Sequence, residues 1–131
     1  MASPAFKVLL IDGDQIVADV YRLALVTAGR VVVIARDGEE GLCMAFGEDP
    51  DFIVVDVRLP RLSGLDVLSG LRTNPKTRSV PVIILSDVGD PELLERGSKL
   101  GALEFMIKAQ TTPGQLNLRI AEHQRWMGQI P

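Results

Sequence analysis

The chain has 131 residues, of which 47% are hydrophobic and 24% charged, and its net charge at pH 7 is −3. These values fit one folded domain and argue against both a disordered chain and a nucleic-acid-binding surface, which requires a basic patch. The single cysteine excludes an internal disulfide, and no apolar run approaches the roughly 20 residues of a membrane span. We therefore expect one cytoplasmic domain over residues 1–131, with its core at 6–127 and no membrane contact.

Five short apolar runs recur along the chain, rich in β-branched or aromatic residues and without alternating polar positions. Such runs are typical of strands that are covered on both faces, as in a parallel sheet. The predicted strands are residues 6–11, 31–35, 52–55, 81–86 and 104–107.

The segments between these strands have helical spacing. Capping signals predict three helix starts: Asp37 with Glu40, Asp90 with Pro91, and Thr112 with Pro113 and Gln115. Apolar spacing predicts the buried faces: Ile16, Val20, Leu23 and Ala24 in the first helix, Leu65, Leu68 and Leu71 in the third, and Leu116, Ile120 and Met127 in the last. Gly29 is predicted to end the first helix.

A strand followed by a helix, five times over, predicts a three-layer α/β domain with a parallel sheet and right-handed crossovers. In such open sheets, ligands bind outside the carboxyl ends of the strands. Four polar side chains are expected at that edge: Asp12, Asp56, Ser86 and Lys108.

These four residues suit phosphoryl transfer to a carboxylate. Asp56 can accept a phosphoryl group as an acyl phosphate, whereas an isolated aspartate after a strand would be read as a turn or cap residue. The transfer needs a divalent cation, a fixed cation and an orienting hydroxyl. Asp12 and Asp56 can bind the divalent cation, Lys108 can serve as the fixed cation, and Ser86 can supply the hydroxyl. Two neighbouring carboxylates are costly unless a cation joins them, which favours a Mg²⁺ site.

Five motifs carry a resemblance to a known family: LLID, ARDGEEGL, VVDVRLPRLSGLDVL, VPVIILS and GALEFMIK. Together they span nearly the whole chain, and the chain resembles the receiver domain of two-component response regulators. The resemblance implies a flavodoxin-like fold, with a doubly wound five-stranded sheet of order 2-1-3-4-5.

The resemblance also implies roles for the residues at the sheet edge. Asp56 would be the phosphoacceptor, with Lys108 and Ser86 assisting. Asp12, Asp56 and the backbone carbonyl of Arg58 would bind Mg²⁺. A domain of this family is a signalling module rather than an enzyme for a diffusible substrate, because its chemistry is limited to its own phosphorylation and dephosphorylation.

For signalling, the resemblance implies that a histidine kinase or phosphotransfer protein supplies the phosphoryl group. Ser86 and Phe105 would form the switch that responds to it. The responding face would consist of residues 92–100, 104–106 and 115–125, on the fourth helix, fifth strand and fifth helix. Its partner would be an unidentified protein or output domain, or a second copy in a homodimer.

Three positions depart from the family pattern. Gly13 stands where receivers carry a second acid, so Mg²⁺ binding is expected to be weak; Asp14, one residue further, would either reach the metal or cap the first helix. Ala109 replaces a proline that is usually cis, and because a non-proline cis bond costs about 2.5–4 kcal/mol, the loop is expected to be trans. Asp87 replaces a small residue and would repel a phosphodonor or supply a metal oxygen.

Two hypotheses remain. Intact Asp12, Asp56, Ser86 and Lys108 favour a phosphorylatable receiver, whereas Gly13, Asp87 and Ala109 favour a pseudo-receiver that binds proteins without phosphorylation. A nucleotide- or flavin-binding enzyme of this fold is disfavoured because neither GxGxxG nor GxxxxGK[ST] is present.

Overall fold

The computed structural model describes residues 5–127 and contains five strands that alternate with five α-helices. The strands are β1 (Lys7–Ile11), β2 (Val31–Ala35), β3 (Phe52–Asp56), β4 (Val82–Ser86) and β5 (Glu104–Ile107). The helices are α1 (Gln15–Thr27), α2 (Gly38–Glu48), α3 (Gly64–Thr73), α4 (Pro91–Lys99) and α5 (Pro113–Met127), and a short 3₁₀ turn, η1 (Lys108–Gln110), follows β5.

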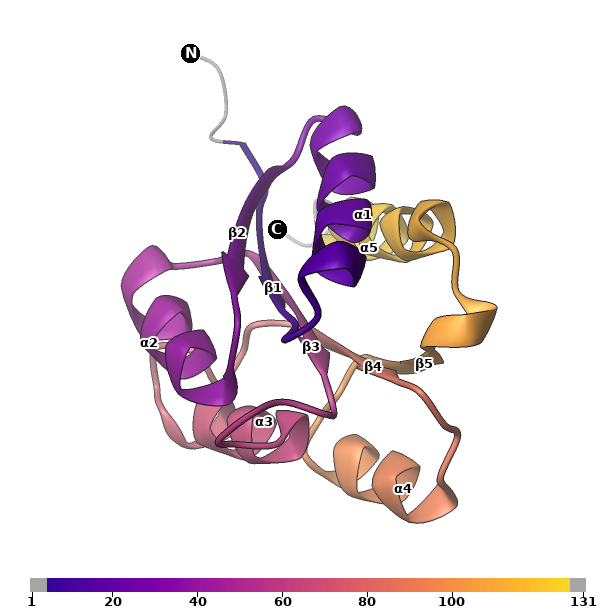
Figure 1. The fold of residues 1–131 in the computed structure, drawn as a ribbon. Coiled ribbons are helices and arrows are strands. Elements are labelled where there is room, and N and C mark those ends of the chain that lie inside the picture. The colour runs from indigo at the N-terminus through magenta and orange to yellow at the C-terminus, as the bar shows by residue number, and fades with distance from the viewer. Residues whose placement is uncertain (1–4, 128–131) are drawn as a thin grey trace.

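All strand pairs are parallel, and the sheet has the order β2-β1-β3-β4-β5. Helices α1 and α5 cover one face of the sheet, whereas α2, α3 and α4 cover the other (Figure 1). The predicted three-layer fold and strand order are therefore confirmed. β3 and β4, which lie inside the sheet, are buried at every position, as their unbroken apolar runs predicted.

The sheet divides the core into two apolar clusters. Successive strand residues point to opposite faces, so Leu9 and Ile11 join the cluster under α2 and α3, whereas Val8 and Leu10 join the cluster under α1 and α5. Strands β3 and β4 contribute to both clusters in the same alternating way. This anchoring on two faces fixes where each strand ends, and therefore where the polar residues at the carboxyl edge lie.

The predicted buried face of α1 was wrong. Ile16, Val20 and Leu23 are 77%, 51% and 66% exposed, whereas the buried residues of α1 are Ala18, Tyr21 and Leu25. Both sets have helical spacing, and α1 is apolar enough for either to serve as a core face. The stripe of Ala18, Tyr21 and Leu25 packs against the sheet, and the Tyr21 hydroxyl finds a hydrogen-bond partner there. The more apolar stripe faces outward.

Most other expectations for the helices hold. Leu65, Leu68 and Leu71 are buried, and Asp37, Asp90 and Thr112 accept hydrogen bonds from the first turns of their helices. Gly29 ends α1 with a positive φ of 90°, a conformation that glycine adopts without strain. The last helix buries Leu116 and Ile120, but Met127 is 40% exposed, contrary to its predicted place on that face.

The corrected face of α1 gives a paired prediction. Leu25→Ala should lower the free energy of unfolding by about 2–5 kcal/mol, because it opens a cavity in a fully buried position. Leu23→Ala, two residues away and exposed, should change it by no more than about 0.5 kcal/mol. Urea denaturation of both variants measures the difference, and a larger loss for Leu23→Ala would restore the face that the sequence pattern favoured.

Candidate functional site

Three charged residues meet at the carboxyl edge of the sheet. Asp12 directly follows β1, Asp56 is the last residue of β3, and Lys108 is the first residue after β5. The Nζ atom of Lys108 lies 2.7 Å from Oδ2 of Asp56 and 3.1 Å from Oδ2 of Asp12. One ammonium therefore bridges two carboxylates that come from neighbouring strands, as the sequence predicted for these three residues.

The backbone holds the other oxygen of each carboxylate. Oδ1 of Asp12 accepts a hydrogen bond of 2.9 Å from the backbone N–H of Asp14, and Oδ1 of Asp56 accepts one of 3.1 Å from the backbone N–H of Arg58. Gly64, at the start of α3, lies so close to the Asp56 carbonyl that a Cβ would have no room. The loop after β3 is thus packed tightly against the residue that it follows.

The cluster is buried and carries more negative than positive charge. Asp12 is 0% and Asp56 6% exposed, so two buried carboxylates share the ammonium of Lys108, whose side chain is 15% exposed. Burial raises the pKa of Asp56 above its ordinary value, although the hydrogen bond and charge of Lys108 oppose that rise. Burial alone would lower the pKa of Lys108, but its contacts with Asp56 and Asp12 raise it instead. Lys108 is therefore held in its charged form.

Ser86 and Phe105 flank this cluster. Ser86 ends β4 and is buried, but its hydroxyl donates to the carbonyl oxygen of Val88 at 2.8 Å and accepts from the Val88 N–H at 3.3 Å. The hydroxyl is thus directed to its own loop. Phe105, on β5, is partly buried and packs against the apolar cluster under α2 and α3.

The remaining acids near the edge do not complete a metal site. Oδ1 of Asp14 accepts from the N–H groups of Ile16 and Val17, at 3.0 and 3.2 Å, so Asp14 caps α1. Asp87 is exposed and pairs with Arg58 at 3.7 Å. Within residues 5–127, no three His, Cys, Asp or Glu side chains gather closely enough to hold a metal ion. Of the two predicted roles of Asp14, the structure shows the cap.

Two further departures from the family pattern lie in this region. A Cβ built on Gly13 would lie 3.2 Å from Cδ of Pro60 and 3.4 Å from the carbonyl oxygen of Arg36. A small shift of the proline ring would therefore admit a side chain at position 13. Residues 5–127 contain no cis peptide bond, so the bond before Ala109 is trans, as its cost predicted.

Two buried hydroxyl groups near Lys108 escaped the sequence analysis. Tyr21 is 5% and Thr111 8% exposed, and Tyr21 Oη donates to the carbonyl oxygen of Thr111 at 3.3 Å. Tyr21 is the only tyrosine in the chain. Its place in a helix full of apolar residues is the one signal that could have singled it out.

A parallel sheet of this order, with two buried carboxylates and a lysine at its carboxyl edge, defines the flavodoxin-like class of signalling receivers. Residues 8–121 match the family model of the response regulator receiver domain. The chain belongs to this family, and it is a receiver of the two-component signalling type.

Several known proteins resemble the chain. It is 33% identical over 107 residues to "Probable chemotaxis protein CheY" of Rhizobium etli, covering 80% of this chain and 82% of that protein. It is 34% identical over 114 residues to "Probable transcriptional regulator ycf27" of Guillardia theta, covering 87% of this chain and 43% of that protein. A high-resolution structure of the chemotaxis response regulator CheY4 of Vibrio cholerae superposes with a TM-score of 0.84 at 26% identity, covering 91% of this chain and 98% of that chain.

The chain spans less than half of the length of several curated relatives that it matches. None of the helices between residues 5 and 127 is both long enough and apolar enough to cross a lipid bilayer.

The excess negative charge of the cluster predicts a stability effect. Asp56→Asn should raise the free energy of unfolding at pH 7 by about 1–2 kcal/mol, because it leaves Asp12 and Lys108 as a balanced pair. The pKa of Asp56 is raised by folding, so the unfolded chain loses this proton first as the pH rises. The advantage of asparagine should therefore be absent below the ordinary pKa of 3.8 and grow as the pH passes it.

Urea denaturation between pH 3.5 and 8 measures this difference. Asp19→Asn, which changes an exposed aspartate on α1, is the control and should leave stability almost unaltered. A variant less stable than the unmodified protein at pH 7 would mean that the bond between Asp56 and Lys108 outweighs the repulsion between the carboxylates.

Proposed function

We propose that Asp56 accepts a phosphoryl group from a histidine kinase or a phosphotransfer protein, and that the chain signals through this modification. The observation that supports the proposal best is the bridging of the buried Asp56 and Asp12 by the Nζ of the partly buried Lys108. Such an arrangement holds a carboxylate nucleophile next to the fixed cation that the transferred group needs.

The proposed chemistry follows from the different contacts of the two oxygen atoms of the Asp56 carboxylate. One oxygen of Asp56 forms a bond to phosphorus while the bond between phosphorus and the donor breaks. Lys108 already lies 2.7 Å from this carboxylate, so its charge can balance the oxygens of the incoming group without a large movement. The N–H of Arg58 keeps the other carboxylate oxygen in place.

The possible ligand atoms at the edge are oxygens, the ligand type that Mg²⁺ prefers. We assign the ion to the carboxylates of Asp12 and Asp56 and the backbone carbonyl of Arg58, because Mg²⁺ prefers oxygen ligands and is often held by only one or two carboxylates together with water. A bound ion would supply positive charge that neutralises the phosphoryl oxygens beside Asp56. Gly13 removes one acid from this set, and Asp14 is engaged as a cap, so we expect the binding to be weak.

Phosphorylation of Asp56 would act on Ser86 and Phe105. A phosphoryl oxygen near Asp56 offers the Ser86 hydroxyl a stronger acceptor than the carbonyl of Val88, which it now contacts. Movement of Ser86 at the end of β4 opens space for Phe105 on the adjacent strand. The change would then reach the face formed by α4, β5 and α5.

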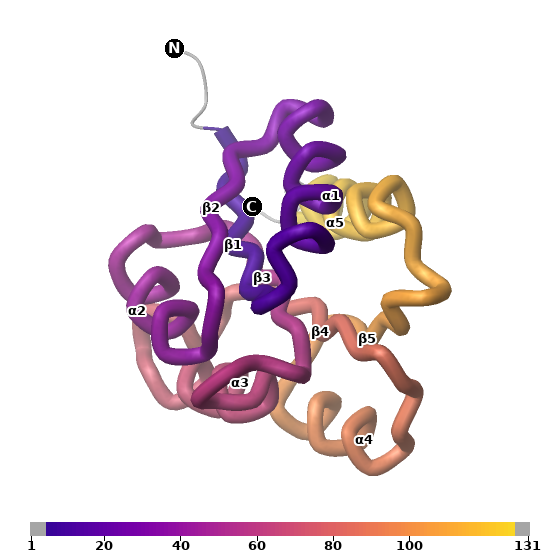
Figure 2. Tube along the Cα trace, viewed as in Figure 1, coloured from indigo at the N-terminus to yellow at the C-terminus, as the bar shows by residue number. Residues whose placement is uncertain are grey.

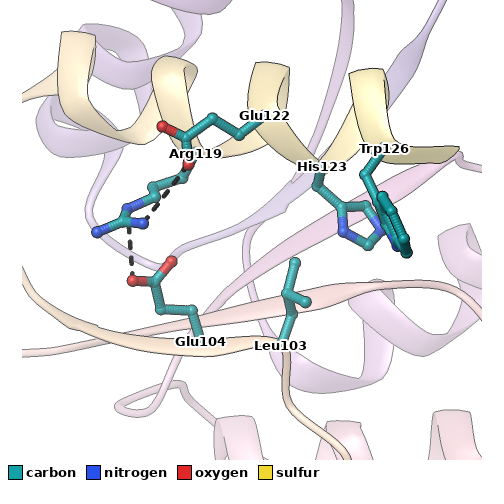
Figure 3. Close-up of a pocket in the computed structure, with 6 residues that line it drawn as sticks. All are labelled: Leu103, Glu104, Arg119, Glu122, His123 and Trp126. Atoms are coloured by element: carbon teal, nitrogen blue, oxygen red, sulfur yellow. Dashed lines mark ion pairs between the residues drawn. The ribbon is translucent and has the colours of Figure 1, made fainter. Parts of the chain in front are cut away.

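This face has features of a protein-binding surface. Figure 3 shows Arg119 between Glu104 and Glu122, with ion-pair distances of 3.4 and 3.5 Å, and His123 beside Trp126 further along α5. Leu103 and Trp126 are 45% and 59% exposed in the same groove. A groove with ion-paired charges at one end and exposed apolar side chains at the other suits a downstream protein, an output domain or a second copy of the chain. We place the protein in the cytoplasm, where such partners operate.

The direct test is intact mass after incubation with acetyl phosphate and Mg²⁺, beside the same reaction with a chelator. We expect one phosphoryl adduct that requires Mg²⁺ and is absent from Asp56→Asn. An adduct that persists in Asp56→Asn would place the acceptor elsewhere.

A second candidate function is a pseudo-receiver that binds partners without phosphorylation. This candidate is favoured because Gly13 replaces an acid, so that Asp12 and Asp56 have no third acidic side chain beside them in the described residues. If no adduct forms under any condition, this candidate is preferred, and the partners must then recognise the unmodified α4-β5-α5 face.

The weak metal site predicts that an added acid strengthens it. Gly13→Asp should tighten Mg²⁺ binding by about tenfold or more, because it supplies another carboxylate close to Asp12. The side chain needs only a small shift of Pro60 to fit. Calorimetric titration with Mg²⁺ measures the affinity, and Gly13→Asn, equal in size but uncharged, is the matched control. Equal affinities for the two variants would show that the lost charge is not what limits the site.

A further inference from the structure

The loop that carries Lys108 is held by hydrogen bonds on both sides of this residue. The Thr111 hydroxyl donates to the carbonyl oxygen of Ile107 at 2.7 Å, and the Thr111 N–H donates to the carbonyl oxygen of Lys108 at 3.2 Å. Thr111 thus contacts the backbone of Lys108 and of the residue before it. Since position 109 is an alanine in a trans linkage, no proline ring restricts this loop.

Tyr21 fixes Thr111 in turn. Its hydroxyl donates to the carbonyl oxygen of Thr111 at 3.3 Å, across 90 residues of sequence. Both residues are buried, so breaking the bond would leave a polar group without a partner and without ready access to water. Tyr21 and Lys108 also line the same groove between α1 and the start of α5. Figure 2 shows the chain running from β5 through this turn into α5, which lies beside α1.

Helix α1 joins the two halves of the charged cluster. At its N-terminus, the N–H of Asp14 holds the carboxylate of Asp12 at 2.9 Å. Tyr21, seven residues on and therefore about two turns along the helix, holds the loop of Lys108. Helix α1 therefore carries contacts to Asp12 and to the loop of Lys108, the two partners of one ion pair.

We propose that Tyr21 is a positioning residue that acts through Thr111 to place the Nζ of Lys108 between Asp12 and Asp56. In this way the Tyr21 hydroxyl controls how fast Asp56 takes up a phosphoryl group, a step that rests on the proposed function. Displacements of about 1 Å at a reacting centre lower rates by up to about 100-fold. The loss of one neutral hydrogen bond at a distance should cost less, about threefold to tenfold.

The test compares Tyr21→Phe and Thr111→Val, which each remove one hydroxyl and keep the size of the side chain. The control is Thr112→Val, which removes the hydroxyl next to Thr111. Thr112 accepts from the N–H of Gln115 and caps α5, so its loss should reduce stability without moving Lys108.

Two readouts are needed. The first is the NMR signal of the Lys108 ammonium group, which is easily assigned because the chain has only four lysines: Lys7, Lys76, Lys99 and Lys108. The second is the rate of adduct formation with acetyl phosphate. We expect Tyr21→Phe and Thr111→Val to shift the Lys108 signal and to slow the adduct by about threefold to tenfold. Thr112→Val should lower only the urea midpoint.

An unchanged Lys108 signal in Tyr21→Phe would overturn the proposal, and so would an equal shift in Thr112→Val, which would reveal general loosening of the loop. If the unmodified protein forms no adduct, the proposed function fails, but the Lys108 signal still decides whether Tyr21 positions this residue.

Discussion

The site depends on one ammonium shared between two buried carboxylates. Lys108 lies within hydrogen-bonding distance of both Asp12 and Asp56, and neither acid is accessible to water to any large extent. Two like charges in such a place would repel each other strongly without it. The rest of the edge serves to keep this arrangement: backbone N–H groups hold the outer oxygens, and the loop after β5 holds the lysine.

This arrangement carries an unbalanced negative charge, which suits the proposed role of Asp56 as a phosphoacceptor. Two negative charges and one positive charge leave the cluster ready to gain another cation, and burial makes that gain larger than it would be in water. A divalent ion would supply the missing charge, whereas the phosphoryl group would bring negative charge that needs both cations. Folding therefore keeps a destabilising feature at the point where we propose that phosphorylation takes place.

Sequence patterns predicted the parts of the molecule that periodic burial controls. The meeting of Asp12, Asp56 and Lys108 follows from parallel strands whose carboxyl ends share one edge. The strand order, in contrast, was predicted from the resemblance to receiver domains. The buried face of α1 did not follow, because this helix carries two apolar stripes and only tertiary packing decides between them. Spacing also left open whether Asp14 reaches the metal site or caps α1, a choice that depends on the backbone after Gly13.

The bonds through Tyr21 and Thr111 were beyond such patterns for a related reason. No sequence periodicity predicts a hydrogen bond between residues 90 positions apart. Its donor, Tyr21, cannot be distinguished by sequence pattern from any other aromatic residue of an apolar helix. Yet the loss of the usual proline at position 109 removes one local restraint on Lys108, and a long-range bond can replace it. In the proposed arrangement, the Tyr21 hydroxyl on α1 supplies a restraint on the position of Lys108 that Ala109, unlike a proline, does not supply.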